Sequence, residues 1–151
     1  MHTLKGDQLI EELGLDYFKQ GSTLGALSDK AIIYLLEQGE VIQLEKGDRL
    51  FEIGDPGDHF YIVLKGTIQF VRFKQGKIAC DIDFAFGEEL GYAAMIALHN
   101  RLGNAQVRED SIVLKVSNAF FYELHETQPA DFEILQLNLS REMARRFRAI
   151  I

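Results

Sequence analysis

The spacing of apolar residues changes twice along the chain and divides it into three parts. Up to Gly39 apolar residues recur every three to four positions, which is typical of amphipathic helices. From Glu40 to Val116 they alternate in short runs separated by Gly and Asp, which indicates strands joined by tight turns. After Ser117 the helical spacing returns. We therefore expect N-terminal helices in 1–39, a β region in 40–116 and C-terminal helices in 117–151.

Cap residues mark where the helices should begin. Asp7 is the expected N-cap of a helix over 7–19, and Ser28 that of a second helix ending at Gly39. Ser117-Asn118 should cap a short helix over 119–124. A long helix is expected from Pro129, with an apolar stripe of Phe132, Leu135, Leu139, Met143 and Phe147.

The middle part contains seven runs that read as strands, with Gln75-Gly76 as a hairpin tip and a short helix over 92–98. The runs are 41–45, 50–53, 60–64, 67–73, 77–84, 105–107 and 112–116. Short strands at regular spacing predict a mainly β fold with antiparallel pairing. We expect a double-stranded β-helix or jelly roll, a β-roll, carrying N-terminal helices and a long C-terminal helix.

Composition narrows the class of protein. The 151 residues fit one domain, 1–151, with a net charge of −7 that disfavours direct DNA binding. The one basic cluster is Arg141, Arg145, Arg146 and Arg148, and at helical spacing it reads as a solvated face. A single cysteine, Cys80, rules out an internal disulfide and a multi-cysteine cluster. The start lacks a secretory signal, and the longest apolar run, 92–98, is too short for a membrane span, so we expect a cytoplasmic protein.

The strongest motif is the stretch 47–68, which reads GDRLFEIGDPGDHFYIVLKGTI. Gly47, Gly54, Gly57 and Gly66 stand where a roll reverses direction, and tight reversals often need positive φ. This stretch resembles the signature of cyclic nucleotide-binding domains, in the sensory domains of the catabolite activator and fumarate–nitrate regulator type. The resemblance extends over nearly the whole chain. It implies a two-sheet β-roll, and because the chain stops at Ile151 we expect no helix-turn-helix after the long helix.

The resemblance also implies a phosphate-binding cassette, which we place at 87–107. In the family a glycine and exposed amides receive the cyclic phosphate, a glutamate accepts a ribose hydroxyl and an arginine neutralises the phosphate. One register keeps Gly91 as the close-approach glycine and puts Tyr92 where the glutamate belongs. A second register uses Phe86-Gly87-Glu88 and restores the acid. We prefer the first, since the second lengthens the following loop.

The arginine has two expected positions. Counting back from Ala105-Gln106-Val107 places it at Gly103, and counting forward from Tyr92 places it at Arg101. Arg101 is then either the phosphate partner or a solvated loop residue. The positions that contact adenine in the catabolite activator fall on 150 and 151, both Ile. The expected ligand-binding residues are Gly91, Tyr92, Ala93, Ala94, Arg101, Asn104, Ala105 and Gln106. The expected ligand is a small anion such as cyclic AMP or cyclic GMP.

Other candidate chemistry is weak. The four histidines show no metal-ligand spacing, and Asp81 with Asp83 offers too few oxygens, so no metal site is expected. Cys80 reads as a buried filler, and no nucleophile and base stand together, so we expect no enzyme.

Two functions remain open. The first is a ligand-sensing regulatory domain that signals through its C-terminal helix to a protein partner or within a homodimer. The second is a pseudo-sensor that binds no nucleotide and serves as an interaction or dimerisation module. The stripe on the long helix bears on both, since its first half should pack on the roll. Its second half either projects into a dimer or folds back on a monomer.

Overall fold

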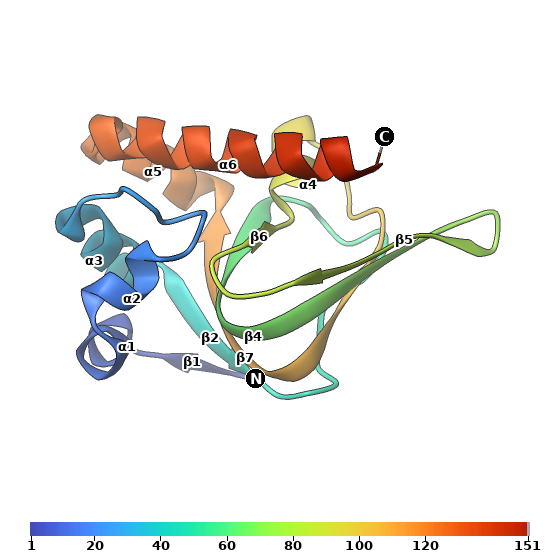
Figure 1. The fold of residues 1–151 in the computed structure, drawn as a ribbon, viewed down its shortest axis with the longest axis horizontal. Coiled ribbons are helices and arrows are strands. Elements are labelled where there is room, and N and C mark those ends of the chain that lie inside the picture. The colour runs from blue at the N-terminus through green and yellow to red at the C-terminus, as the bar shows by residue number, and fades with distance from the viewer. Residues whose placement is uncertain (151) are drawn as a thin grey trace.

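The computed structural model describes residues 1–150, with the N-terminal helices beside one end of the sheet and the long C-terminal helix crossing above it (Figure 1). The N-terminal part contains β1 (His2–Leu4), α1 (Gly6–Leu13), α2 (Leu15–Lys19) and α3 (Asp29–Gln38). The middle part contains β2 (Glu40–Leu44), β3 (Arg49–Phe51), β4 (His59–Lys74), β5 (Lys77–Phe84), β6 (Glu89–Leu90), α4 (Tyr92–Ala97) and β7 (Asn104–Ser117). The chain continues with α5 (Asn118–Thr127) and α6 (Pro129–Ile150).

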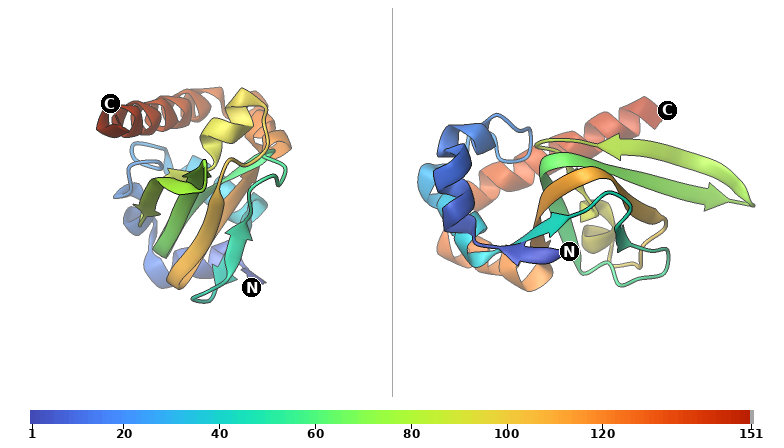
Figure 2. Two further views of the ribbon diagram at one scale, coloured as in Figure 1. Left: turned by 90° about the vertical axis from the view of Figure 1, so that its right-hand side faces the viewer. Right: turned by 90° about the horizontal axis from the view of Figure 1, so that it is seen from below.

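One curled antiparallel sheet makes up the roll (Figure 2). Its strand order is β1-β2-β7-β4-β5, with β3 paired to β7 and β6 paired to β4. The two longest strands, β4 and β7, run side by side, and their register shifts between Val63 and Ile68. Such irregularities bend a strand and raise its twist, which allows the sheet to close on itself. The predicted mainly β roll with flanking helices is confirmed.

Local signals placed most elements correctly. Ser28 Oγ accepts a hydrogen bond from the backbone N–H of Ala31 at 3.2 Å, and Ser117 Oγ accepts one from Phe120 at 3.1 Å. The runs 105–107 and 112–116 are one continuous strand, because the exposed residues between them keep the ladder although they break the apolar pattern. Residues 2–4 add a short edge strand that the sequence did not indicate.

The expected helix over 7–19 is two helices, α1 and α2. Gly14 lies between them at φ 84°, a conformation that ends the first helix. The N-cap is Lys5 rather than Asp7, and Asp7 instead accepts a hydrogen bond from Gln8 N at 2.9 Å. Gly6, the first residue of α1, packs closely on α3, since a Cβ there would collide with the carbonyl of Leu36.

The glycine-rich stretch forms the turns of the roll. Three of its glycines have positive φ, namely Gly47, Gly54 and Gly66. Gly57 instead permits a close approach, since a Cβ there would lie 2.4 Å from the carbonyl oxygen of His99. Gly47 and Gly54 therefore lie in tight turns and Gly57 in a packing contact beside the loop after α4. The expected reversal at Gly66 is wrong, because Gly66 lies within β4 at a register shift that bends the strand without ending it.

Helix α6 runs along the top of the domain, with its first half above the N-terminal helices and its second half above the roll (Figure 1). Leu135 and Leu139 are fully buried, Met143 is half-buried and Phe147 is 64% exposed. The first half of the helix thus packs on the domain as expected. The second half of the helix lies over the roll in this single chain, and the homodimer stays a prediction.

Candidate functional site: an apolar cavity with a buried arginine

A cavity of about 900 Å³ lies between the roll and the second half of α6. Its apolar walls come from six elements and include Phe51, Phe70, Ile82, Phe84, Leu90, Ala94 and Met143. Both strands of the β4–β5 hairpin contribute, as does the segment from β6 through α4 to position 102. The volume falls within the range of ligand pockets, about 300–1,000 Å³.

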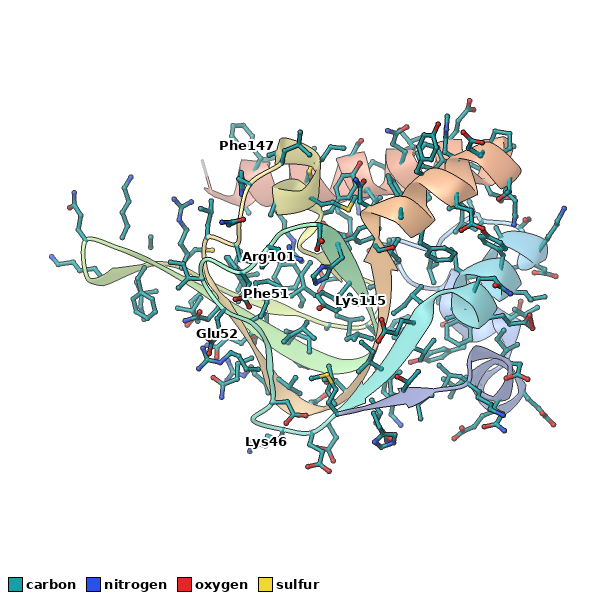
Figure 3. All side chains as sticks on the ribbon, turned by 180° about the vertical axis from the view of Figure 1, so that it is seen from behind. Lys46, Phe51, Glu52, Arg101, Lys115 and Phe147 are labelled. Carbon is teal, nitrogen blue, oxygen red and sulfur yellow. The ribbon has the colours of Figure 1, made fainter. Side chains whose placement is uncertain are left out.

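Arg101 lines this cavity and is only 2% exposed. Its Nη1 donates to the Gly91 carbonyl at 3.0 Å and its Nη2 donates to the His59 carbonyl. The guanidinium stacks 4.4 Å from the centre of the Phe51 ring, as Figure 3 lets the reader follow. Among residues 1–150 no carboxylate lies within ion-pairing distance of it, and its Nε has no hydrogen-bond partner. Burial lowers the pKa of Arg101 from its usual value.

Two neighbours fix the position of this guanidinium. Gly91 has φ 95°, and a Cβ there would lie 2.5 Å from Nη1 of Arg101, so only glycine fits. His59 is held on both ring nitrogens, by Asp58 Oδ1 at 2.7 Å and by Tyr61 Oη at 2.9 Å. Burial raises the pKa of Tyr61 to about 12 and lowers that of His59. A neutral imidazole, held between the Asp58 carboxylate and the Tyr61 hydroxyl, therefore supports the carbonyl that Arg101 binds.

Glu89 is the one carboxyl group that the described residues place on the cavity wall, and it is 4% exposed. Its Oε2 accepts a hydrogen bond from Tyr92 N at 3.2 Å, and its own N–H donates to Glu142 Oε2 at 3.1 Å. Burial, assisted by the negative charge of Glu142, raises the pKa of Glu89 to about 8. Glu89 is therefore largely protonated at neutral pH, and the lining carries net positive charge.

The rim of the cavity is basic. Arg72 and Lys74 come from the hairpin and Arg146 comes from α6. Arg146 Nη2 pairs with Glu88 Oε2 at 3.0 Å, and its guanidinium lies 3.8 Å from the centre of the Phe84 ring. Helix α6 is thus joined to both residues of the segment 88–89, to Glu88 through Arg146 and to Glu89 through Glu142.

The structure brings half of the expected ligand-binding residues together. Gly91, Ala93, Ala94 and Arg101 all line the cavity. Tyr92 is directed into the core instead, 5.3 Å from Phe60 and 5.8 Å from Phe121 between ring centres.

The remaining three expected residues lie on β7 away from the lining. Asn104 accepts a hydrogen bond from Ile53 N at 2.8 Å, Ala105 is fully buried and Gln106 is exposed. Gly103, the other position expected for the arginine, is buried, and a Cβ there would lie 2.5 Å from the Val71 carbonyl oxygen. Residue 151 lies outside the described residues, as does the side chain of Ile150.

Sequence reasoning missed Glu89, the acid that lies on the cavity wall. Both registers considered placed Tyr92 or Glu88 at the acidic position, because they required a glycine directly before it. A third alignment accepts Glu88 where the family motif has that glycine. It places Glu89 at the acidic position of the motif and Gly91 at the position of the small residue that follows. The burial of Glu89 beside a half-buried Glu88 agrees with this alignment.

Comparisons with known proteins agree with the fold. A model of the cyclic nucleotide-binding domain matches residues 41–128, and the chain belongs to this family. A cyclic nucleotide-binding domain from Methylobacillus flagellatus has a TM-score of 0.83 at 20% identity, covering 99% of this chain and 84% of that one. The catabolite activator protein of Thermus thermophilus has a TM-score of 0.71 at 21% identity, covering 85% and 59%. The sensor domain of the Pseudomonas aeruginosa transcriptional regulator DNR has a TM-score of 0.68 at 19% identity, covering 92% and 94%.

Similar sequences also occur inside much larger proteins. The lysophospholipase nte1 of Neurospora crassa is 23% identical over 146 residues, which is 96% of this chain and 9% of that protein. The chain thus spans about a tenth of the curated relatives it matches. It is a regulatory domain of the cyclic nucleotide-binding type. Within the described residues, no helix combines the length and apolar character needed to cross a membrane.

Proposed function

We propose that this domain senses a small anionic ligand, which binds inside the roll and acts through α6. The observation that carries the proposal is Arg101, a buried cation on the wall of the cavity with no carboxylate partner among the described residues. A charge is seldom buried without a compensating partner, and an anionic ligand supplies one. Cyclic AMP and cyclic GMP, the ligand class of the family, are the first candidates.

The route from ligand to output passes through segment 88–89. A ligand that contacts Arg101 and Gly91 lies close to Glu89 in the chain. The backbone N–H of Glu89 is bonded to Glu142 on α6. A shift of this segment changes the contacts that hold the second half of the helix. A domain responds to ligand in this way when the ligand favours one of two arrangements of a bistable element.

Thermal melting with each cyclic nucleotide tests the binding step. A ligand at one hundred times its Kd should stabilise the fold by about 2.7 kcal/mol. Arg101→Gln should remove that stabilisation, whereas the matched control Arg108→Gln, on an exposed arginine paired with Asp83, should retain it. Equal responses of the two variants would exclude Arg101 from the site.

The signalling step has a separate readout. The chain has no tryptophan, so Phe147→Trp on α6 gives a single fluorescent reporter at the rim of the cavity. Bound ligand should change its emission, and a Tyr122→Trp reporter on exposed α5 should stay constant. An unchanged Phe147→Trp spectrum with ligand bound would contradict signalling through the helix.

A second candidate function is that of a pseudo-sensor which acts as an interaction or dimerisation module. It is favoured by the position of Tyr92 in the core and by the lack of room for a side chain at Gly103. The partner would contact the exposed apolar residues of α6, Leu137 and Phe147. Sedimentation of the wild type and of Phe147→Asp tests it: a dimer dissociated by the substitution supports this function, and a monomeric wild type excludes the dimer.

A further inference from the structure

The polar groups of the cavity are concentrated at a few points. Arg101 lies against Gly91 and Phe51, while Arg72 and Lys74 are exposed residues of the hairpin. Most other lining positions carry carbon side chains, which include three phenylalanines from the strands and Met143 from α6. The cavity therefore has one fully buried cation and an extended apolar wall.

Arg101 has capacity for one more acceptor group. A guanidinium carries five N–H donors in a planar fork, and two nitrogens of Arg101 already bind the carbonyls of Gly91 and His59. Its buried Nε has no partner in the described residues, so an acceptor there would satisfy a donor that is otherwise unpaired. A carboxylate matches this fork with two parallel oxygens.

The rest of the wall offers little to a sugar or a base. The amide of Tyr92 is already bonded to Glu89, and the ring of Tyr92 lies in the core. Ser140 supplies the one aliphatic hydroxyl among the lining residues, and it is exposed. Apart from Glu89, which already accepts a hydrogen bond from Tyr92 N, and the exposed His99 and Ser140, such a wall offers ribose hydroxyls and base nitrogens little to replace the hydrogen bonds they lose on leaving water. A hydrocarbon chain would lose none.

From this arrangement we infer that the cavity binds a medium- or long-chain acyl carboxylate, with its carboxylate on Arg101 and its chain along the apolar wall towards Met143 and Phe147. The inference rests on the proposed function of anion sensing and names the class of ligand. Each added methylene buried against the wall should tighten binding about fourfold.

Calorimetric titration of the whole domain with octanoate, decanoate and dodecanoate tests the class of ligand. Affinity should rise about fourfold per methylene, and methyl dodecanoate should bind at least tenfold more weakly than dodecanoate because the ester lacks the charge. Arg101→Gln should weaken dodecanoate at least tenfold, and Arg108→Gln should not. Ester and acid binding with equal affinity would overturn the inference.

A pair of tryptophan substitutions on α6 locates the chain. Ala144 lines the cavity and Ala149 does not, although both are exposed on the same helix. Ala144→Trp should abolish dodecanoate binding by filling the path of the chain, and Ala149→Trp should leave it unchanged. Dodecanoate binding that survives Ala144→Trp would place the ligand elsewhere and overturn the inference.

Cyclic AMP and cyclic GMP form the comparison arm of the same titration. If either binds with dependence on Arg101 while no carboxylate binds, the acyl inference fails and the proposed function stands. If neither the nucleotides nor the carboxylates bind, both fail.

Discussion

Glu89→Gln should remove most of the loss of stability that this domain shows as the pH rises. The pKa of Glu89 is raised from 4.5 to about 8 by burial and by the neighbouring Glu142. Between these two values the folded domain keeps a proton that the unfolded chain has released. The free energy of unfolding therefore falls by about 1.4 kcal/mol per pH unit over that interval. The stability that the raised pKa of Glu89 contributes is fully present below pH 4.5 and is lost by pH 8.

The expected size follows from the width of the interval. From pH 5 to pH 8 the wild type should lose roughly 3–4 kcal/mol through this carboxyl group. For a domain of this size that corresponds to a fall of about 10 °C in Tm. Gln keeps the shape of the side chain and an oxygen that can accept from Tyr92 N, but it cannot ionise.

Thermal melts followed by circular dichroism at pH 5, 6, 7 and 8 measure the effect. The difference in Tm between Glu89→Gln and wild type should grow with pH, because contributions from other titrating groups cancel in the comparison. Glu88→Gln, which changes the adjacent carboxylate paired with Arg146, should keep the wild-type slope. Parallel curves for wild type and Glu89→Gln would refute the assignment of a buried, protonated Glu89.

Three further substitutions test the packing. Leu139→Ala on the buried face of α6 should cost about 2–5 kcal/mol in urea unfolding, and a loss below 1 kcal/mol would mean that the helix is not docked in solution. Gly87→Ala should also destabilise the fold, since Gly87 has φ 82° and its Cβ would lie 2.3 Å from Gly21 Cα; unchanged thermal stability would contradict this contact. Ser117→Ala should cost about 1 kcal/mol by removing the cap on Phe120 N, and a neutral effect would show that the cap is not formed.

The sequence predicted the fold well because its turn and cap residues act locally. Gly47, Gly54 and Gly66 adopt the positive φ expected of them, and Ser28 caps its helix through its own hydroxyl. The error over 7–19 also has a local cause, since Gly14 was read as an ordinary helical position and instead separates two helices.

The site was less predictable because its members are joined by contacts far apart in the chain. Arg101 binds the carbonyl of His59, 42 positions away, and Glu89 bonds to Glu142, 53 positions away. Periodicity carries no information on such contacts. Tyr92 was placed in the ligand site from its neighbours in sequence, whereas burial against Phe60 determines where its ring lies.

The anchoring of α6 limits how the domain can respond to whatever occupies the roll. Asp131 accepts hydrogen bonds from the N–H and hydroxyl of Ser28, and Asn138 Nδ2 donates to the carbonyls of Thr23 and Gly25. The helix is thereby fixed to the N-terminal region, and Ser22 Oγ, which donates to Glu142, extends this attachment by one turn. A rigid swing of the whole helix would break all three attachments at once, so the response open to this domain is a bend or an unwinding after residue 142.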